Sequence, residues 1–256
     1  MPGAIGPNFM IVLRDEQRIA RLGRLAQILS LAGLAALVVG LVIIFVFDNQ
    51  ANVFLYQLLA LLVGYSLSQV GLHYAHRYLR QPRMDVVLDR AASKFARKDG
   101  RIYHYLLPAP HVLLLPTGVF VLTAKFQNGR ITANGDSWQQ TGLGMRRFFG
   151  REGLGNPTRE AEAQAAKMAE FIREHAPAAA GAPLIPIIVF TAQNIGALDV
   201  KESRIPAVHA SKLSGALRQQ SINLKPLPKE QYDALRAAFD GEAAHLLEAT
   251  VEESGE

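Results

Sequence analysis

The sequence contains no cysteine, so disulfide bonds, thiolate nucleophiles and zinc sites built on sulfur are all excluded. It also shows no spacing typical of a Ser-His-Asp triad, a glycine-rich phosphate-binding loop or a His-x-x-x-His metal pair. Charged residues account for 19% of the chain, whereas hydrophobic residues account for 50%. This excess of apolar residues indicates a membrane segment joined to a soluble part.

Positive charge is concentrated near the beginning of the chain. Residues 1–83 contain seven arginines and three acidic residues, a net charge of +4, and the remaining residues carry a net charge of +1. The soluble part therefore lacks the general basic surface expected of a nucleic-acid-binding protein. A chain of 256 residues has room for one domain of ordinary size with appendages.

Two long apolar runs lie at residues 25–47 and 53–72, and neither contains a charged residue. Each is long enough to cross a bilayer as a helix, and the polar residues 48–52 form the turn between them. A signal peptide is excluded, because its apolar part is shorter and no second run would follow at once. The alternative is a buried helical hairpin in a soluble protein, which would be costly wherever its packing was incomplete.

Arginines flank both runs, while the turn between them contains only Asp48 as a charged residue. The positive-inside rule therefore predicts a cell-membrane protein with two crossings and with both termini in the cytoplasm. Before the first crossing, arginines recur on one helical face, which predicts a short interfacial helix over residues 11–24. The arginines of that face are Arg14, Arg18 and Arg21.

Small residues recur at every fourth position on one face of each predicted crossing. They are Ala32, Ala36 and Gly40 in the first crossing and Ala60, Gly64 and Ser68 in the second. This spacing lets two helix backbones approach closely. It predicts that the hairpin packs on itself, and homo-oligomerisation through the same faces is an alternative. The lipid bilayer is thus the first predicted partner, and a second copy of the chain is another.

The soluble part begins with an amphipathic helix predicted at residues 84–95. Two buried strands at 111–115 and 119–124 are predicted to form a hairpin around the turn at 116–118. The asparagine–glycine pairs at 128–129 and 134–135 are typical of further hairpin turns, so the pattern predicts a meander of about five short strands.

Beyond the meander, Asn156 can cap a helix whose first residue is Pro157. An apolar run at 184–191 predicts a strand that is buried on both faces. A weaker strand and two helices are predicted at 207–209, 211–219 and 229–247. The expected organisation has four parts: an interfacial N-terminal segment at 1–24, a transmembrane hairpin at 25–83, an α/β domain at 84–222, and a C-terminal helix with an acidic tail at 223–256.

Two features of the soluble part are candidates for binding. Lys125 directly follows the second buried strand, so it either ends that strand in water or meets an anion. A glycine-rich loop at 141–155 combines arginine with phenylalanine, and it either contacts a phosphate backbone or lipid headgroups or is an ordinary solvated loop. Its predicted ligand-binding residues are Arg146, Arg147 and Arg151.

Four segments occur in a characteristic order: the run His-Val-Leu-Leu-Leu-Pro-Thr-Gly-Val-Phe-Val-Leu-Thr-Ala-Lys at 111–125, then Trp138, Asn156-Pro157 and the strand at 187–190. In this order they resemble the nuclease-related domain (NERD), a branch of the PD-(D/E)XK nuclease superfamily. The resemblance covers residues 84–222 and none of the membrane hairpin. It implies an α/β fold with a restriction-endonuclease-like mixed sheet flanked by helices.

The resemblance also implies a metal site, with an acidic residue just before the histidine and a Glu-x-Lys at the end of the next strand. Two such carboxylates hold a divalent cation that polarises phosphate and activates water. In this sequence Pro110 and Thr123 occupy the two acidic positions, and Lys125 alone fits. Asp85 or Asp89 could supply the acid that the leading helix often contributes in this family.

Two functions are therefore weighed. The first is a membrane-anchored pseudoenzyme that needs no cofactor and acts as a binding or scaffolding module. The second is a membrane-associated DNA nuclease with a rearranged Mg²⁺ site, for which Asp136 is the nearest migrated acid. In the first case Lys125 could simply end its strand or form a structural ion pair with Asp85 or Asp89. A small transport subunit is a distant third hypothesis, because two uncharged crossings offer no ion path unless several copies assemble.

Overall fold

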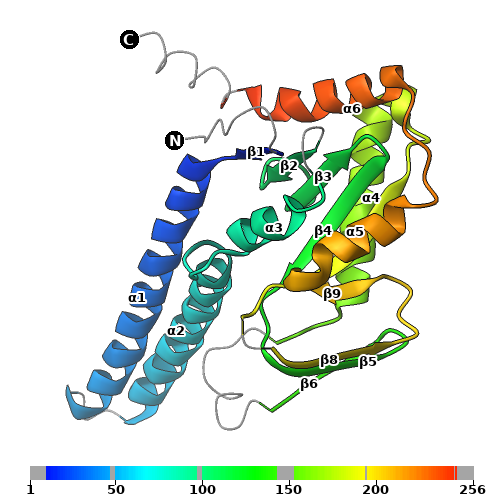
Figure 1. Ribbon diagram of the computed structural model, residues 1–256. Coiled ribbons are helices and arrows are strands. Elements are labelled where there is room, and N and C mark those ends of the chain that lie inside the picture. The colour runs from blue at the N-terminus through cyan, green and yellow to red at the C-terminus, as the bar shows by residue number, and fades with distance from the viewer. Residues whose placement is uncertain are drawn as a thin grey trace. The chain divides into compact units, whose positions relative to one another are not determined.

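The structure is a computed structural model that describes residues 10–46, 50–96, 100–142, 153–193, 195–244 and 246. The chain divides into two compact units. One is a helical hairpin that includes Glu16–Arg83, and the other is an α/β unit formed by residues before and after it (Figure 1). Each unit is treated by itself below.

The hairpin consists of two long helices, α1 (Glu16–Val46) and α2 (Gln50–Tyr78). Both are long and apolar enough to cross a membrane. Their apolar side chains are largely exposed, for example 81% of Phe45 and 67% of Phe54. A soluble protein would bury such side chains, so the exposed apolar surface favours a lipid environment. The predicted crossings are confirmed as helices, apart from the last residue of the first run, which lies outside the described residues.

Close packing within the hairpin depends on glycines. A Cβ atom added to Gly33 would lie 2.8 Å from the carbonyl oxygen of Gly64, and one added to Gly40 would lie 2.8 Å from the Cβ of Ala60. Bulkier side chains at these glycines would therefore push the two helices apart. Close packing through Gly40, Ala60 and Gly64 was predicted from the sequence and is confirmed.

The rest of the predicted small-residue face on α1 is wrong for packing within the hairpin. Ala32 is exposed and Ala36 is half-buried, whereas Ala26, Gly33 and Gly40 are buried. The buried residues are seven positions apart, which is the repeat that keeps one face of a helix against an antiparallel neighbour. A four-residue repeat drifts around the helix and leaves that face.

The main sheet of the α/β unit has six strands in the order β1-β2-β3-β4-β7-β9. Strands β2, β3 and β4 are antiparallel neighbours, and the other three pairings are parallel. The predicted central hairpin is confirmed, since Leu115 of β3 pairs with Gly118 of β4. The strands are β1 (Ile11–Arg14), β2 (Arg101–His104), β3 (His111–Leu115), β4 (Gly118–Lys125), β7 (Leu184–Phe190) and β9 (Ala207–His209).

A second sheet contains β5 (Gly129–Asn134), β6 (Ser137–Thr141) and β8 (Ile195–Lys201). The pair at 134–135 forms the predicted hairpin turn between β5 and β6. The pair at 128–129 does not, because β5 lies between β6 and β8 and leaves the main sheet. The prediction of one continuous meander is therefore wrong. Strand β8 pairs with β5 across more than sixty residues of chain, and this non-local pairing has no local turn signal.

Four helices of eight or more residues cover the main sheet within the described part of the α/β unit: α3 (Met84–Ala92), α4 (Pro157–His175), α5 (Leu213–Ser221) and α6 (Lys229–Glu242). Leu88 of α3 and Leu217 of α5 are buried with Phe120 on one face. Met168 of α4 and Phe239 of α6 are buried with alternate strand residues on the other face. The predicted mixed α/β fold with flanking helices is confirmed.

The interfacial helix predicted from residue 11 is wrong for its first four residues. They form β1, which runs parallel to β2, and α1 begins at Glu16. The apolar run Ile11-Val12-Leu13 favours a strand, and Leu13 is buried in the core beside α4 and α6. The α/β unit therefore has an edge strand that precedes the hairpin in sequence, outside the domain predicted at 84–222.

Helix α6 is attached to the sheet by a polar contact as well as by Phe239. Arg101 donates to both carboxylate oxygens of Asp240 at 2.8 and 2.6 Å, and the hydroxyl of Tyr103 donates to the same carboxylate at 2.8 Å. Burial, and then the neighbouring Asp240 carboxylate, raise the pKa of Tyr103 above its usual value. The protonated phenol is thus part of the native contact.

Tyr103→Phe is expected to lower the free energy of unfolding by about 1.5–3 kcal/mol, because it removes a hydrogen bond to a charged group. Since the pKa of Tyr103 is raised, its contribution is present below about pH 10 and is lost as the pH rises further. Urea unfolding near neutral pH and above pH ~10 tests this. The wild-type chain should lose more stability at high pH than the variant, and equal losses would contradict the assignment.

Candidate functional site

A buried polar network lies at the end of β4, where the side chains of Thr123 and Lys125 point toward α4. Lys125 forms an ion pair with Glu160, and Thr123 donates a hydrogen bond of 2.9 Å to the Oε1 atom of Gln164. Glu160 and Gln164 lie one helical turn apart, and the amide of Gln164 donates to Glu160 at 3.4 Å. Lys125 is 8% exposed and Thr123 is fully buried.

Local structure holds both sides of this network in place. The backbone amide and hydroxyl of Thr191 donate to the carbonyl of Lys125 at 2.7 and 3.2 Å, which fixes the end of β4. The Oδ1 atom of Asn156 accepts from the amide of Arg159 at 3.1 Å and caps α4, as the sequence predicted. Glu160 therefore lies in the first turn of α4, where the helix dipole stabilises a carboxylate.

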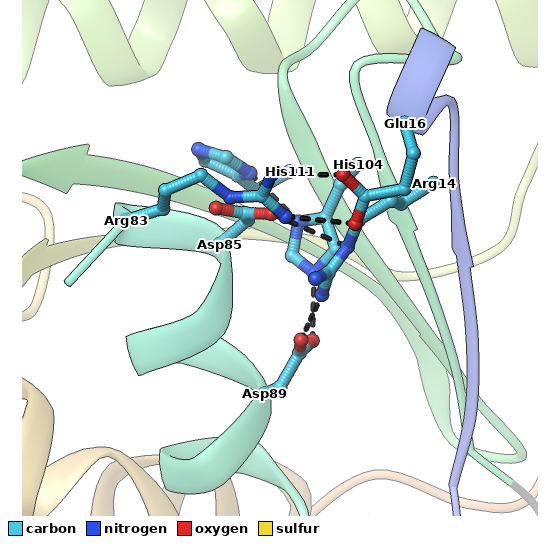
Figure 2. Close-up of polar contacts among 7 residues, drawn as sticks. All are labelled: Arg14, Glu16, Arg83, Asp85, Asp89, His104 and His111. Atoms are coloured by element: carbon cyan, nitrogen blue, oxygen red, sulfur yellow. Dashed lines mark hydrogen bonds and ion pairs between the residues drawn. The ribbon is translucent and has the colours of Figure 1, made fainter. Parts of the chain in front are cut away.

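A second polar network surrounds Asp85 and Asp89 of α3 (Figure 2). Arg14 forms ion pairs with both carboxylates, and its Nε atom lies 3.2 Å from Asp85. The Nε2 atom of His104 lies 2.8 Å from Asp89, and its Nδ1 atom lies 2.8 Å from the Nδ1 atom of His111. One of these two Nδ1 atoms must donate and the other accept. Asp85 and His104 are fully buried.

The two networks lie on opposite faces of the main sheet. Side chains alternate between faces along a strand, so His104 shares the face of Ile102, which is buried against α3. Lys125 shares the face of Val121, which is buried against α4. Asp85 and Asp89 are therefore separated from Lys125 by the sheet. The predicted ion pair of Lys125 with either aspartate is wrong, because its partner is Glu160.

A comparison with family models bears on the first network. Residues 88–191 match the model of the nuclease-related domain, NERD. This chain carries a NERD domain. The match runs from α3 to the end of β7 and includes both Lys125 and Glu160. Neither a curated protein nor a solved structure matches the chain. The predicted resemblance is thus confirmed for the core of the α/β unit.

The register of the NERD domain brings the expected site positions together. Val112 lies opposite Val121 in the β3–β4 pair. Extending this register by two residues, past the start of β3 at His111, brings Pro110 opposite Thr123. Both positions then share the face of Lys125. The sheet supplies the arrangement that the resemblance implies, but proline and threonine stand where it implies carboxylates.

The residues at this site do not fit a divalent metal ion. Mg²⁺ in nuclease-like sites needs carboxylate oxygens, and here Lys125 and Thr123 contact one carboxylate and one neutral amide. Among the residues that the structure describes, no group of three or more His, Asp or Glu side chains is placed to hold a metal. At the second network, the guanidinium of Arg14 already pairs with both aspartates and offsets one of their two negative charges.

Other predicted residues fall elsewhere. Asp136, the suggested migrated acid, accepts from the Nε atom of Arg204 at 2.6 Å in the turn between β5 and β6. The predicted ligand-binding residues Arg146, Arg147 and Arg151 lie outside the described residues. Sequence reasoning missed Glu160. Its position in the first turn of α4, four residues before Gln164, could have indicated that the two side chains lie on one face of the helix. Sequence reasoning also did not bring His104 and His111 together, because their cross-strand pairing depends on the β2–β3 register.

Glu160→Gln is expected to lower the free energy of unfolding by about 1–2 kcal/mol, because Lys125 is left buried without its carboxylate. The partial exposure of Glu160 keeps the loss below that of a fully buried pair. Glu162→Gln is the matched control. Glu162 lies on the same helix as Glu160, and its replacement removes an exposed ion pair with Arg204. The free energy of unfolding should change by less than about 0.5 kcal/mol. Urea unfolding measures both variants, and equal losses of stability in Glu160→Gln and Glu162→Gln would show that the Lys125–Glu160 pair is not structurally important.

Proposed function

We propose that this chain is a membrane-anchored NERD domain that has lost metal-dependent nuclease chemistry and serves as a binding or scaffolding module at the cytoplasmic face. The observation that carries the proposal is the network around Lys125. Thr123 and Lys125 bond to Gln164 and Glu160 of α4, in the place where a nuclease would hold its metal. A lysine that is already paired with the half-buried Glu160 carboxylate is less able to offset the charge of a phosphoryl group.

The anchor supports the membrane part of the proposal. Two helices with largely exposed apolar surfaces pack closely on one another, and arginines gather at the end of the hairpin where α1 begins and α2 ends. By the positive-inside rule this end faces the cytoplasm. The α/β unit, which connects to the hairpin at that end in sequence, would then be held at the inner surface of the cell membrane.

One observation favours a second candidate function. Glu160 is a carboxylate beside Lys125, so it could replace one of the acids that the family positions lack. The chain would then be a DNA nuclease with a rearranged site. A second metal-binding carboxylate would still be needed, and Thr123 and Gln164 offer only neutral oxygens.

A cleavage assay separates the two functions. The full chain in detergent is incubated with supercoiled and linear DNA and Mg²⁺ or Mn²⁺, beside Lys125→Ala and the control Lys167→Ala, which changes an exposed lysine of α4. We expect all three proteins to show the same background rate. Metal-dependent cleavage that is lost in Lys125→Ala and kept in Lys167→Ala would overturn the proposal and establish the nuclease.

A further inference from the structure

The hairpin unit contains a cavity of about 330 Å³ between the start of α1 and the end of α2. Its apolar wall includes Ile19, Gly23 and Leu79, and polar groups from both ends of the hairpin complete the lining. The polar and charged lining residues are Glu16, Arg24, Gln27, Tyr78, Gln81 and Arg83. A cavity of this size with a few converging polar groups is typical of a small-molecule site.

The cavity lies at the boundary between the charged and apolar parts of the hairpin. Arg24 is the last charged residue of α1 before the uncharged run that starts at Leu25. Tyr78 ends α2, and its ring stacks on that of Tyr74 at 6.2 Å between centroids. Aromatic rings of this kind mark the level of lipid headgroups in membrane helices. A ligand in the cavity would therefore lie at headgroup depth.

The charge of the cavity favours an anion. Its one acidic residue, Glu16, accepts two hydrogen bonds of 2.8 Å from Arg83, so the carboxylate is neutralised within the wall. Arg24 adds a further positive charge to the lining. Basic residues close to a membrane surface attract anionic headgroups. The end of the hairpin carries four more arginines: Arg18, Arg21, Arg77 and Arg80.

We propose that this cavity binds the phosphate-bearing headgroup of an anionic phospholipid, with Arg24 as its main charged contact. Gln27 and Gln81 supply further donors to phosphate or glycerol oxygens, and the acyl chains follow the exposed apolar surface of the hairpin. The inference rests on the membrane placement proposed above but not on the loss of nuclease chemistry. It makes the anchor selective for lipid composition, rather than a passive tether.

Lipid retention measured by native mass spectrometry tests the proposal. The full chain in detergent is mixed with equal amounts of phosphatidylglycerol and phosphatidylcholine that have the same acyl chains. We expect the wild-type chain to retain phosphatidylglycerol preferentially and Arg24→Gln to reduce this preference about fivefold, as expected for one arginine at a headgroup. The matched control Arg21→Gln removes the same charge from a residue outside the cavity lining and should keep the preference.

A second variant leaves every charge in place. Ala20 is an exposed cavity residue, so Ala20→Phe should fill the space and expel the headgroup without disturbing the helix. Equal losses of the phosphatidylglycerol preference in Arg24→Gln and Arg21→Gln, or full retention of the lipid by Ala20→Phe, would overturn the site in favour of diffuse electrostatic attraction.

A competition experiment distinguishes a lipid headgroup from free phosphate. An excess of inorganic phosphate should displace little lipid. Complete displacement would overturn the lipid assignment and identify a soluble phosphate ligand. Because lipid retention is read independently of DNA cleavage, this proposal and the proposed loss of nuclease activity can fail separately.

Discussion

Arg14→Met is expected to lower the free energy of unfolding of the α/β unit by about 3–5 kcal/mol, the cost of removing one partner from a buried ion pair. Arg14 is the cation beside Asp85, which is fully buried, and beside Asp89. Without the guanidinium, Asp85 and Asp89 would lose the cation that pairs with both of them, and Asp85 is fully buried. Strand β1 would also lose the side chain that ties it to α3.

Urea unfolding of the full chain in detergent measures this effect. Trp138 is the single tryptophan, and it contacts Phe190 and Thr158 within the α/β unit, so its fluorescence reports on that unit alone. Arg90→Met is the matched control, because Arg90 is exposed on α3, and it should change stability by less than about 0.5 kcal/mol. A small loss in Arg14→Met would show that the buried pair contributes little to folding.

The double variant Pro110→Asp/Thr123→Glu is expected to create a divalent metal site. The β3–β4 register, extended two residues beyond the pair Val112–Val121, brings these two positions opposite each other on the face of the sheet that carries Lys125. Two carboxylates on adjacent strands are the ligands that the wild-type site lacks. We expect Mn²⁺ affinity to rise at least about a hundredfold over the wild-type chain, a gain of ~3 kcal/mol.

The same titration on Gln139→Glu/Thr141→Asp controls for general charge. This variant adds two carboxylates to exposed positions of β6, away from Lys125. Trp138 fluorescence confirms that each variant is folded. If the site variant bound Mn²⁺ no more tightly than this control, the register would not place the two positions together as the strand pairing implies.

The sequence predicted those strands and helix ends that depend only on neighbouring residues. Strands β3, β4 and β7 appear as continuous apolar runs because both of their faces are buried. The capping of α4 by Asn156 and Pro157 needs only neighbouring residues. The central hairpin and the order of elements were also enough to identify the NERD resemblance, which the family model confirms over residues 88–191.

Contacts between distant segments could not be predicted in this way. Strand β1 joins the main sheet although it precedes the helical hairpin in sequence, and β8 pairs with β5 although β6, α4 and β7 lie between them along the chain. The partner of Lys125 depends on which face of the sheet each helix covers, and the sequence did not fix this. The candidate site was therefore predicted by position, through Pro110, Thr123 and Lys125, while Glu160 and Gln164 emerged from the packing of α4.

Isothermal titration calorimetry of the full wild-type chain with Mg²⁺ and Mn²⁺ tests the central claim most directly. If the network of Glu160, Gln164, Thr123 and Lys125 has replaced the metal site, the chain should show no saturable binding in the millimolar range. Glu160→Gln should give the same trace. Stoichiometric binding to the wild-type chain that is lost in Glu160→Gln would contradict the account and restore the rearranged nuclease.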